Sequence, residues 1–227
     1  MSTLKMLLSQ TLSSLSGNWL KAIGMLLLAG MLYMVSAMTI IGPLFIIGAI
    51  YLGMSDFFLT LARGKEASVS QLFNGFNQFG KALGVTLIMI MVIMVGMVLF
   101  FIPGIIAALA FSQVYFVMLD KPELGVMDTL KESHEIMKGK KRKLFLYAFL
   151  GYIALYAVLL PFNLILLDQE AVQQQMMNGD IIGGYMAMGP YMAFSMLVGL
   201  LFGPFAYAFL ANFYVRVVGG EQEEVLI

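Results

Sequence analysis

The side chains of this chain that could do acid–base or metal chemistry are few and scattered. Its 227 residues include one histidine, His134, and no cysteine. The lack of cysteine excludes disulfides, thiolate catalysis and cysteine metal sites. His134 and its neighbour Glu135 match neither a zinc-binding helix nor a catalytic triad, so we interpret the histidine as a ring packed at the edge of a helix. We therefore expect no catalytic residue, no metal and no cofactor, and a protein that is not an enzyme.

Anion binding is the second kind of chemistry, and one short basic segment could provide it. The segment places five cations within six residues, just before a long apolar run: Lys138, Lys140, Lys141, Arg142 and Lys143. A lysine or arginine near a membrane surface contributes about 1 kcal/mol to the binding of anionic lipid. The segment lacks the upstream glycine and downstream hydroxyl of a phosphate loop. Two compatible interpretations stay open: these residues bind lipid headgroups, or their charge only keeps the loop in the cytoplasm.

Polar side chains inside the apolar runs are the third group of candidates. They are Asp56, Gln113, Asn163 and Asn212. An ionisable group within a membrane span is a functional candidate by default, so Asp56 could line a polar pathway. The alternative, which we favour, is a structural pairing, with Arg63 within reach only if the helix continues that far. The three amides predict hydrogen bonds between helices.

The composition indicates that membrane-spanning helices position these groups. Hydrophobic residues make up 61% of the chain and charged residues 11%, and the mean hydropathy is +0.91. Soluble domains have about 45–50% apolar and about 25% charged residues. The formal net charge is zero, so no overall field favours nucleic acid as a partner. We predict an all-α, polytopic membrane protein.

Two long uncharged stretches are each divided by a glycine and a proline. One runs between Lys21 and Asp56 with Gly42-Pro43 in its middle, and the other contains Pro103-Gly104. A span takes about 20 residues, and proline disfavours helix at the residue before it, so each stretch predicts a hairpin of two spans. With two later apolar runs, the prediction is six spans, at about residues 20–41, 44–62, 81–102, 104–119, 144–167 and 190–215.

The distribution of charge predicts the orientation of these spans. All 13 basic residues fall near the N-terminus, in the loops between spans two and three and spans four and five, or at the C-terminal end. The opposite loops carry only Asp168, Glu170 and Asp180. By the positive-inside rule both termini lie in the cytoplasm. We expect a multi-pass protein of the cell membrane whose first span is an uncleaved anchor.

The first two hairpins share a phrase and a spacing. Lys21-Ala22-Ile23-Gly24 and Lys81-Ala82-Leu83-Gly84 lie 60 residues apart, as do the two hairpin prolines. A third unit begins near Gly125 and has an insertion at 168–189. We predict one membrane domain of three repeated hairpin units, at about 1–62, 63–122 and 123–216, and a polar cytoplasmic tail at 217–227. The alternative is that membrane spans use few residue types, so that two spans resemble each other by chance.

An amphipathic segment precedes each hairpin, and we expect these segments to be cytoplasmic interfacial helices. Apolar residues recur at helical spacing in each. The expected apolar faces are Leu4, Leu8, Leu12, Leu15 and Trp19 in the first segment, Val69, Leu72, Phe73, Phe76 and Phe79 in the second, and Val126, Met127, Leu130, His134 and Met137 in the third. Ser68-x-x-Gln71 predicts a capping box at the start of the second segment.

Several phrases together resemble a known family. They are Leu72-Phe73-x-x-Phe76, Ile102-Pro103-Gly104, Asp120-x-Pro122, Ser133-x-x-x-Met137-Lys138-Gly139 with Leu144-Phe145, and Pro204-Phe205 with Phe213-Tyr214. This set resembles a bacterial family of integral membrane proteins of unknown function, which is distantly similar to the membrane domain of some glycerophosphodiester phosphodiesterases. The resemblance covers roughly residues 60–216. It implies a six-span bacterial membrane protein and supplies no catalytic residue.

Three hypotheses for function follow from these observations. The first is a non-enzymatic scaffold, assembly or envelope-homeostasis protein that acts through its interfacial helices and basic loop. The alternative is a transporter or lipid-handling protein whose repeats form a cavity near the midplane. A membrane enzyme is third, since it would need a second ionisable group opposite Asp56. The expected partners are membrane lipids, chiefly anionic ones, and other proteins in the membrane, with no nucleic acid.

Overall fold

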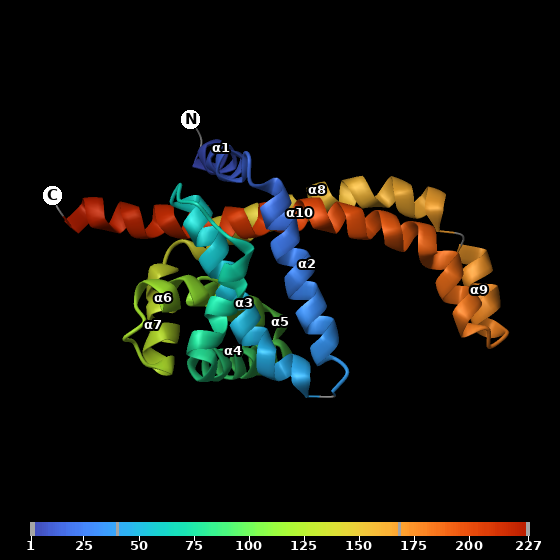
Figure 1. Cartoon of the computed structure of the whole chain (residues 1–227), viewed down its shortest axis with the longest axis horizontal. Coiled ribbons are helices and arrows are strands. Elements are labelled where there is room, and N and C mark those ends of the chain that lie inside the picture. Colours follow the sequence, from blue (N-terminus) through green and yellow to red (C-terminus); the bar gives the residue numbers. More distant parts are fainter. Residues whose placement is uncertain (1–2, 40, 168, 226–227) are drawn as a thin grey trace. The chain divides into compact units, whose positions relative to one another are not determined.

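The computed structural model describes residues 3–39, 41–167 and 169–225, and all its secondary structure there is helical (Figure 1). The elements are α1 (Thr3–Leu15), α2 (Trp19–Ser36), α3 (Gly42–Ala62), the 3-10 helix η1 (Val69–Gln78), α4 (Phe79–Leu99), α5 (Phe101–Ala110), α6 (Val114–Asp120), α7 (Val126–Ile136), α8 (Lys141–Leu166), α9 (Gln169–Met177) and α10 (Ile181–Val225). The chain divides into two compact units, Met1–Phe145 with Pro204–Ile227, and Leu146–Gly203.

Six helical stretches of the described chain are long and apolar enough to cross a membrane. They are Trp19–Ser36, Gly42–Ala62, Val69–Leu99, Phe101–Asp120, Lys141–Leu166 and Ile181–Gly219. The predicted all-helical class with six candidate spans is therefore confirmed by length and composition. We call each of these six stretches a candidate span.

The predicted hairpin positions are confirmed at both prolines. α2 ends at Ser36, and α3 begins at Gly42 with Pro43 in its first turn. α4 ends at Leu99, Phe100 is extended, and α5 begins with Pro103 in its first turn. Proline fits at these places because the first amides of a helix have no partner within the helix.

Two boundaries differ from the prediction. The fourth candidate span is broken at 111–113, where a turn separates α5 from α6. α10 begins at Ile181 rather than near 190, because Asp180 accepts a hydrogen bond from the Gly183 amide (2.9 Å) and so caps the helix. α9 and the first turns of α10 therefore occupy the predicted insertion loop. Asp168 of that loop lies outside the described residues.

The buried side chains of the first unit gather in the half of each candidate span that lies beside its basic residues. They come from Ala22 to Ala29 in α2, Gly48 to Leu61 in α3, Ala82 to Thr86 in α4, Ala110 to Met118 in α5 and α6, and Ala208 to Val217 in α10. One continuous core joins Leu130 of α7 to members of this set, which are Leu52, Ala82, Val85, Val114, Tyr115 and Met118. The opposite halves of α2 and α4 carry exposed Met34, Val35, Val98 and Leu99 instead. Helices with such apolar surfaces are typical of proteins surrounded by lipid.

The second unit, Leu146–Gly203, has few buried side chains. Phe162 of α8 and Phe194 of α10 stack with ring centroids 3.9 Å apart, and they join these two helices of the unit. Tyr152, Tyr156 and Leu164 are exposed on α8. Gly199, which belongs to the predicted small-residue face of the sixth span, has nothing within 4 Å of the position of an added Cβ.

Candidate functional site

Three short helices of the first unit, α1, η1 and α7, are each joined to another helix by side-chain hydrogen bonds; we call them the docked helices. They correspond to the three amphipathic segments of the sequence. α1 is held by α10, where the buried Asn212 donates from Nδ2 to Ser14 Oγ at 3.1 Å and to the Ala208 carbonyl at 2.8 Å. The predicted interhelical role of Asn212 is therefore seen in the structure.

η1 lies along α3 and is held there by two polar contacts. Asn74 donates from Nδ2 to Asp56 Oδ2 at 2.7 Å, and Gln71 donates from Nε2 to Thr60 Oγ1 at 2.9 Å. The predicted capping box is present. The Ser68 side chain accepts from the backbone amide of Gln71, and the Gln71 side chain accepts from the backbone amide of Ser68. η1 therefore follows α3 from the level of Thr60 towards its middle, as a 3-10 rather than an α-helix.

Two glycines permit this close approach of backbones. A Cβ built on Gly53 would collide with the carbonyl of Leu72, and one built on Gly75 would collide with the carbonyl of Ala49. The two backbones can come this close only because the residues at these contacts, Gly53 and Gly75, have no side chain. Gly75 thus brings η1 against α3 near the place where Asp56 and Asn74 meet.

α7 packs on α5 and α6 through hydroxyl groups as well as apolar side chains. Ser133 donates from Oγ to the Ala110 carbonyl at 2.8 Å, and Lys121 Nζ lies 2.6 Å from Glu132 Oε1. The predicted apolar face is partly wrong, because Met127 and His134 are exposed while Thr129 and Ser133 are buried. The Thr129 hydroxyl bonds the Gly125 carbonyl, so this polar side chain can be buried without an unpaired group.

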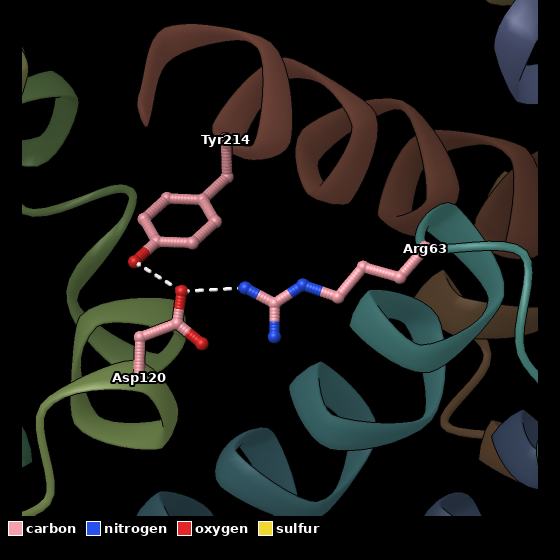
Figure 2. Close-up of polar contacts among 3 residues, drawn as sticks. All are labelled: Arg63, Asp120 and Tyr214. Carbon is pink, nitrogen blue, oxygen red and sulfur yellow. Dashed lines mark hydrogen bonds and ion pairs between the residues drawn. The ribbon is translucent and has the colours of Figure 1, made fainter. Parts of the chain in front are cut away.

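An ion pair with a shared acceptor joins the C-terminal ends of α3 and α6 to α10 (Figure 2). Arg63 follows the last residue of α3, Asp120 ends α6, and Tyr214 lies on α10. One carboxylate oxygen of Asp120, Oδ2, lies 2.6 Å from Arg63 Nη2 and 3.0 Å from the Tyr214 hydroxyl. The Arg63 side chain is 38% exposed and that of Asp120 is 23% exposed, so water screens the pair in part.

We call Arg63, Asp120 and Tyr214 the Asp120 cluster, and sequence reasoning did not find it. Arg63 was considered only as a partner for Asp56, but the structure pairs it with Asp120. Asp120 and Tyr214 both belong to the phrases that carried the family resemblance. Those phrases were therefore the available signal, although nothing in the sequence showed that residues 94 positions apart would meet.

The structure does not bring the predicted intramembrane polar residues together. Asp56 is half-buried and bonds Asn74, whereas Asn212 bonds Ser14. Gln113 is fully buried in the break between α5 and α6, where its Nε2 donates to Ser112 Oγ at 3.2 Å. Asn163 lies on α8 in the second unit and is half-buried.

The basic segment connects α7 to α8 through Gly139, whose φ of +69° suits glycine. Lys138 Nζ lies 2.6 Å from Glu135 Oε2, and this hydrogen bond lowers the pKa of Glu135 below its ordinary value. Lys140 and Lys141 are half-buried, and Arg142 and Lys143 are exposed at the start of α8. Lys138 is exposed as well, while Arg142 and Lys143 lie at a helix start, where the helix dipole also favours anions.

The polar contacts described above join helices to one another. In the described part of the chain, no three His, Asp or Glu side chains lie close enough to hold a metal ion. The charged groups of the Asp120 cluster neutralise one another, and Asp56 is engaged by an amide.

These features define an all-helical protein with six membrane-capable helices and a polar layer at their basic ends. The chain belongs to the family described as "Protein of unknown function (DUF975)", whose model matches residues 86–219. This confirms the predicted membership of a family of unknown function. The chain shows no significant similarity to a curated protein or to a solved structure. Asp120, Tyr214 and the basic segment lie inside the matched region, whereas Asp56 and Arg63 precede it.

Proposed function

We propose that this chain is a multi-pass protein of the bacterial cell membrane that acts as a scaffold or assembly component without catalysing a reaction. The observation that carries the proposal is that side-chain hydrogen bonds join each docked helix to another helix. Ser14 accepts from Asn212 of α10, Asn74 donates to Asp56 of α3, and Ser133 donates to the Ala110 carbonyl of α5. Helices of 10 to 13 residues are marginal alone in water, so they depend on this docking.

A fixed layer of short helices favours recognition of a partner. A surface that is ordered before binding loses less conformational entropy when the partner arrives. Phe73 of η1 and Met127 of α7 are large apolar side chains that remain exposed on this layer. Together with the exposed Arg142 and Lys143, they are suited to contact anionic headgroups and a second membrane protein.

The order of elements supports the proposed threefold repeat. α1 is followed by α2 and α3, and α7 is followed by α8 and α10. η1 leads without a gap into α4, with which it forms one membrane-capable stretch, and α5–α6 follows. We propose that the docked helices lie on the cytoplasmic side, which the basic residues beside them favour. The distant similarity to the membrane domain of glycerophosphodiester phosphodiesterases stays a prediction.

Reconstitution separates a scaffold from the alternative of a lipid-handling protein. The purified chain is inserted into vesicles that contain a fluorescent phospholipid, and dithionite then reports how fast that lipid crosses the bilayer. A scaffold predicts the same rate as in vesicles without protein. Acceleration that scales with the amount of protein would overturn the proposal in favour of lipid handling.

Site-specific crosslinking tests the scaffold directly. A photoreactive amino acid is placed at Phe73 or Met127 on the docked helices, and at Met94 or Val98 as matched exposed apolar controls on α4. A scaffold predicts discrete protein adducts from the first two positions and lipid adducts alone from the controls. Lipid adducts from all four positions would count against a protein partner at this layer.

A further inference from the structure

α1 has two apolar faces, and only one of them is covered by the protein. Leu7, Thr11 and Leu15 are buried against the first unit. Leu8 and Leu12, each one residue further along, are 36% and 53% exposed. They lie four residues apart and so form one strip on the helix surface, adjoining the buried face. The predicted stripe of leucines is thus divided between a face that docks and a face that stays open.

The remaining surface of α1 is polar but almost without charge. Gln10 and Ser13 are exposed on the side away from the open leucine strip, and the exposed Ser9 lies between them and the strip. Lys5 is the one ionisable side chain in Thr3–Leu15, and no acidic residue precedes Asp56 in the sequence. Most helices that lie on membranes carry several lysines or arginines on their polar face. α1 has hydroxyl groups in that place instead.

The position of α1 is fixed near the end of a candidate span. Residues 16–18 alone separate it from α2, and three residues reach at most about 11 Å. The Asn212–Ser14 hydrogen bond also ties α1 to α10, and Figure 1 shows α1 beside the first turns of α2. If α2 crosses a bilayer, α1 must therefore lie at the level of the headgroups.

We propose that α1 is a membrane-surface helix whose Leu8–Leu12 strip inserts among the lipid headgroups, and that its insertion depends on lipid packing rather than on lipid charge. The affinity of an interfacial helix comes from buried apolar area and from attraction to anionic lipid. With one lysine the second contribution is small, so the leucines must find gaps between headgroups. Such gaps are more frequent in curved or unsaturated bilayers. This inference stands without the proposed scaffold function.

The experiment uses the full chain, which has no cysteine of its own. Leu12→Cys and Leu8→Cys report the open strip, and Ser13→Cys is the matched control on the polar face. Each variant is labelled with an environment-sensitive fluorophore and reconstituted in three kinds of vesicle. These are small vesicles of unsaturated phosphatidylcholine, large vesicles of saturated phosphatidylcholine, and the large vesicles with added phosphatidylglycerol. Emission wavelength and quenching by iodide are measured in low and high salt.

The expected result is that probes at positions 8 and 12 are blue-shifted and quenched several-fold less by iodide than the probe at position 13. This protection should be greatest in the small unsaturated vesicles, and it should change little with phosphatidylglycerol or with salt. Iodide access at positions 8 and 12 in all vesicles would overturn the membrane-surface assignment. Protection that follows anionic lipid and disappears in salt would overturn the packing dependence. Protection that is lost when protein is diluted at constant vesicle type would assign the strip to a second copy instead.

Discussion

At the scale of single residues, Asp120 is the group on which the packing of the basic ends depends most directly. Its Oδ2 atom accepts from both Arg63 and Tyr214, which belong to the ends of two other candidate spans. Hydrogen bonds to charged groups contribute about 1.5–3 kcal/mol when they are well shielded. Since Arg63 is more than one-third exposed, the lower end of that range applies here.

Asp120→Asn is expected to lower the free energy of unfolding by about 1–2 kcal/mol, because the amide cannot balance the Arg63 charge. Tyr214→Phe removes one hydrogen bond and should cost about 0.5–1.5 kcal/mol. Asp128→Asn, which affects the exposed pair with Lys131, is the matched control and should change stability by less than about 1 kcal/mol. Thermal unfolding in detergent measures all three. Equal effects of Asp120→Asn and Asp128→Asn would contradict the assignment.

The second prediction at this scale concerns the basic segment. Replacing the four cations within 140–143 by glutamine should reduce the anionic lipid that co-purifies, whereas Glu135→Gln should increase it by releasing Lys138. The difference between the two variants should shrink in high salt. Native mass spectrometry counts the bound lipids. Unchanged retention in both variants, with normal insertion, would leave only the role of the charges in topology.

The pH dependence of this segment has a definite sign. The hydrogen bond from Lys138 lowers the pKa of Glu135, so the carboxylate stays ionised at neutral pH. The stability that the Glu135–Lys138 pair contributes is therefore present above the ordinary pKa of glutamate. It is lost as pH falls through the lowered pKa of Glu135. Lipid retention by the wild type should rise towards that of Glu135→Gln only in this acidic range.

At the scale of elements, the sequence allowed the hairpins to be predicted but not the docking of the short helices. Pro43 and Pro103 set the hairpins because proline restricts its own backbone and that of the residue before it. The buried faces of α1 and α7 include Thr11, Thr129 and Ser133, which a hydropathy pattern counts as polar. Their hydroxyls donate to main-chain carbonyls, those of Thr11 and Thr129 within their own helical segment and that of Ser133 on α5. These hydrogen bonds offset the cost of burying a polar group, and residue type alone does not show that they form.

The long-range contacts of the candidate site could not be predicted for a related reason. Asp56, Gln113 and Asn212 were found as polar residues in apolar runs, which is a local property. Their partners Asn74 and Ser14 lie in different elements, and one sequence does not show which elements meet. The break at 111–113 was also missed, because no proline or glycine marks it.

The docking of η1 on α3 leads to a prediction with a matched control. Gly75→Ala should destabilise the protein by about 1–3 kcal/mol, since the added methyl group would meet the backbone of Ala49. Gly80 lies two residues beyond η1, in the first turn of α4, and has nothing within 4 Å of its Cβ position. Gly80→Ala should therefore stabilise α4 by up to about 1 kcal/mol. Thermal unfolding in detergent should therefore show opposite signs. The same sign and size in both variants would mean that η1 does not pack on α3.

At the scale of the whole molecule, the first unit places its core beside the basic residues. In α2, α3 and α4 the buried side chains lie near Lys21, Arg63 and Lys81, while the hairpin ends near Pro43 and Pro103 are largely exposed. This distribution fits spans that pack with one another near one face of a membrane and contact lipid elsewhere. The positive-inside rule predicts that this face is the cytoplasmic one, and labelling can test that prediction.

The topology prediction is that the basic loops and the loop around α9 lie on opposite sides of the membrane. The absence of native cysteine allows single variants to be labelled without background. Glu66→Cys and Glu123→Cys replace exposed residues in the loops after α3 and α6, and Met177→Cys replaces an exposed residue at the end of α9. A membrane-impermeant maleimide should label Met177→Cys in intact cells, and should label the other two only after the membrane is opened. The two basic loops lie on the same side only if an even number of spans separates them. An odd number would appear as a difference in labelling between Glu66→Cys and Glu123→Cys. Labelling of all three variants from one side would rule out the six-span arrangement.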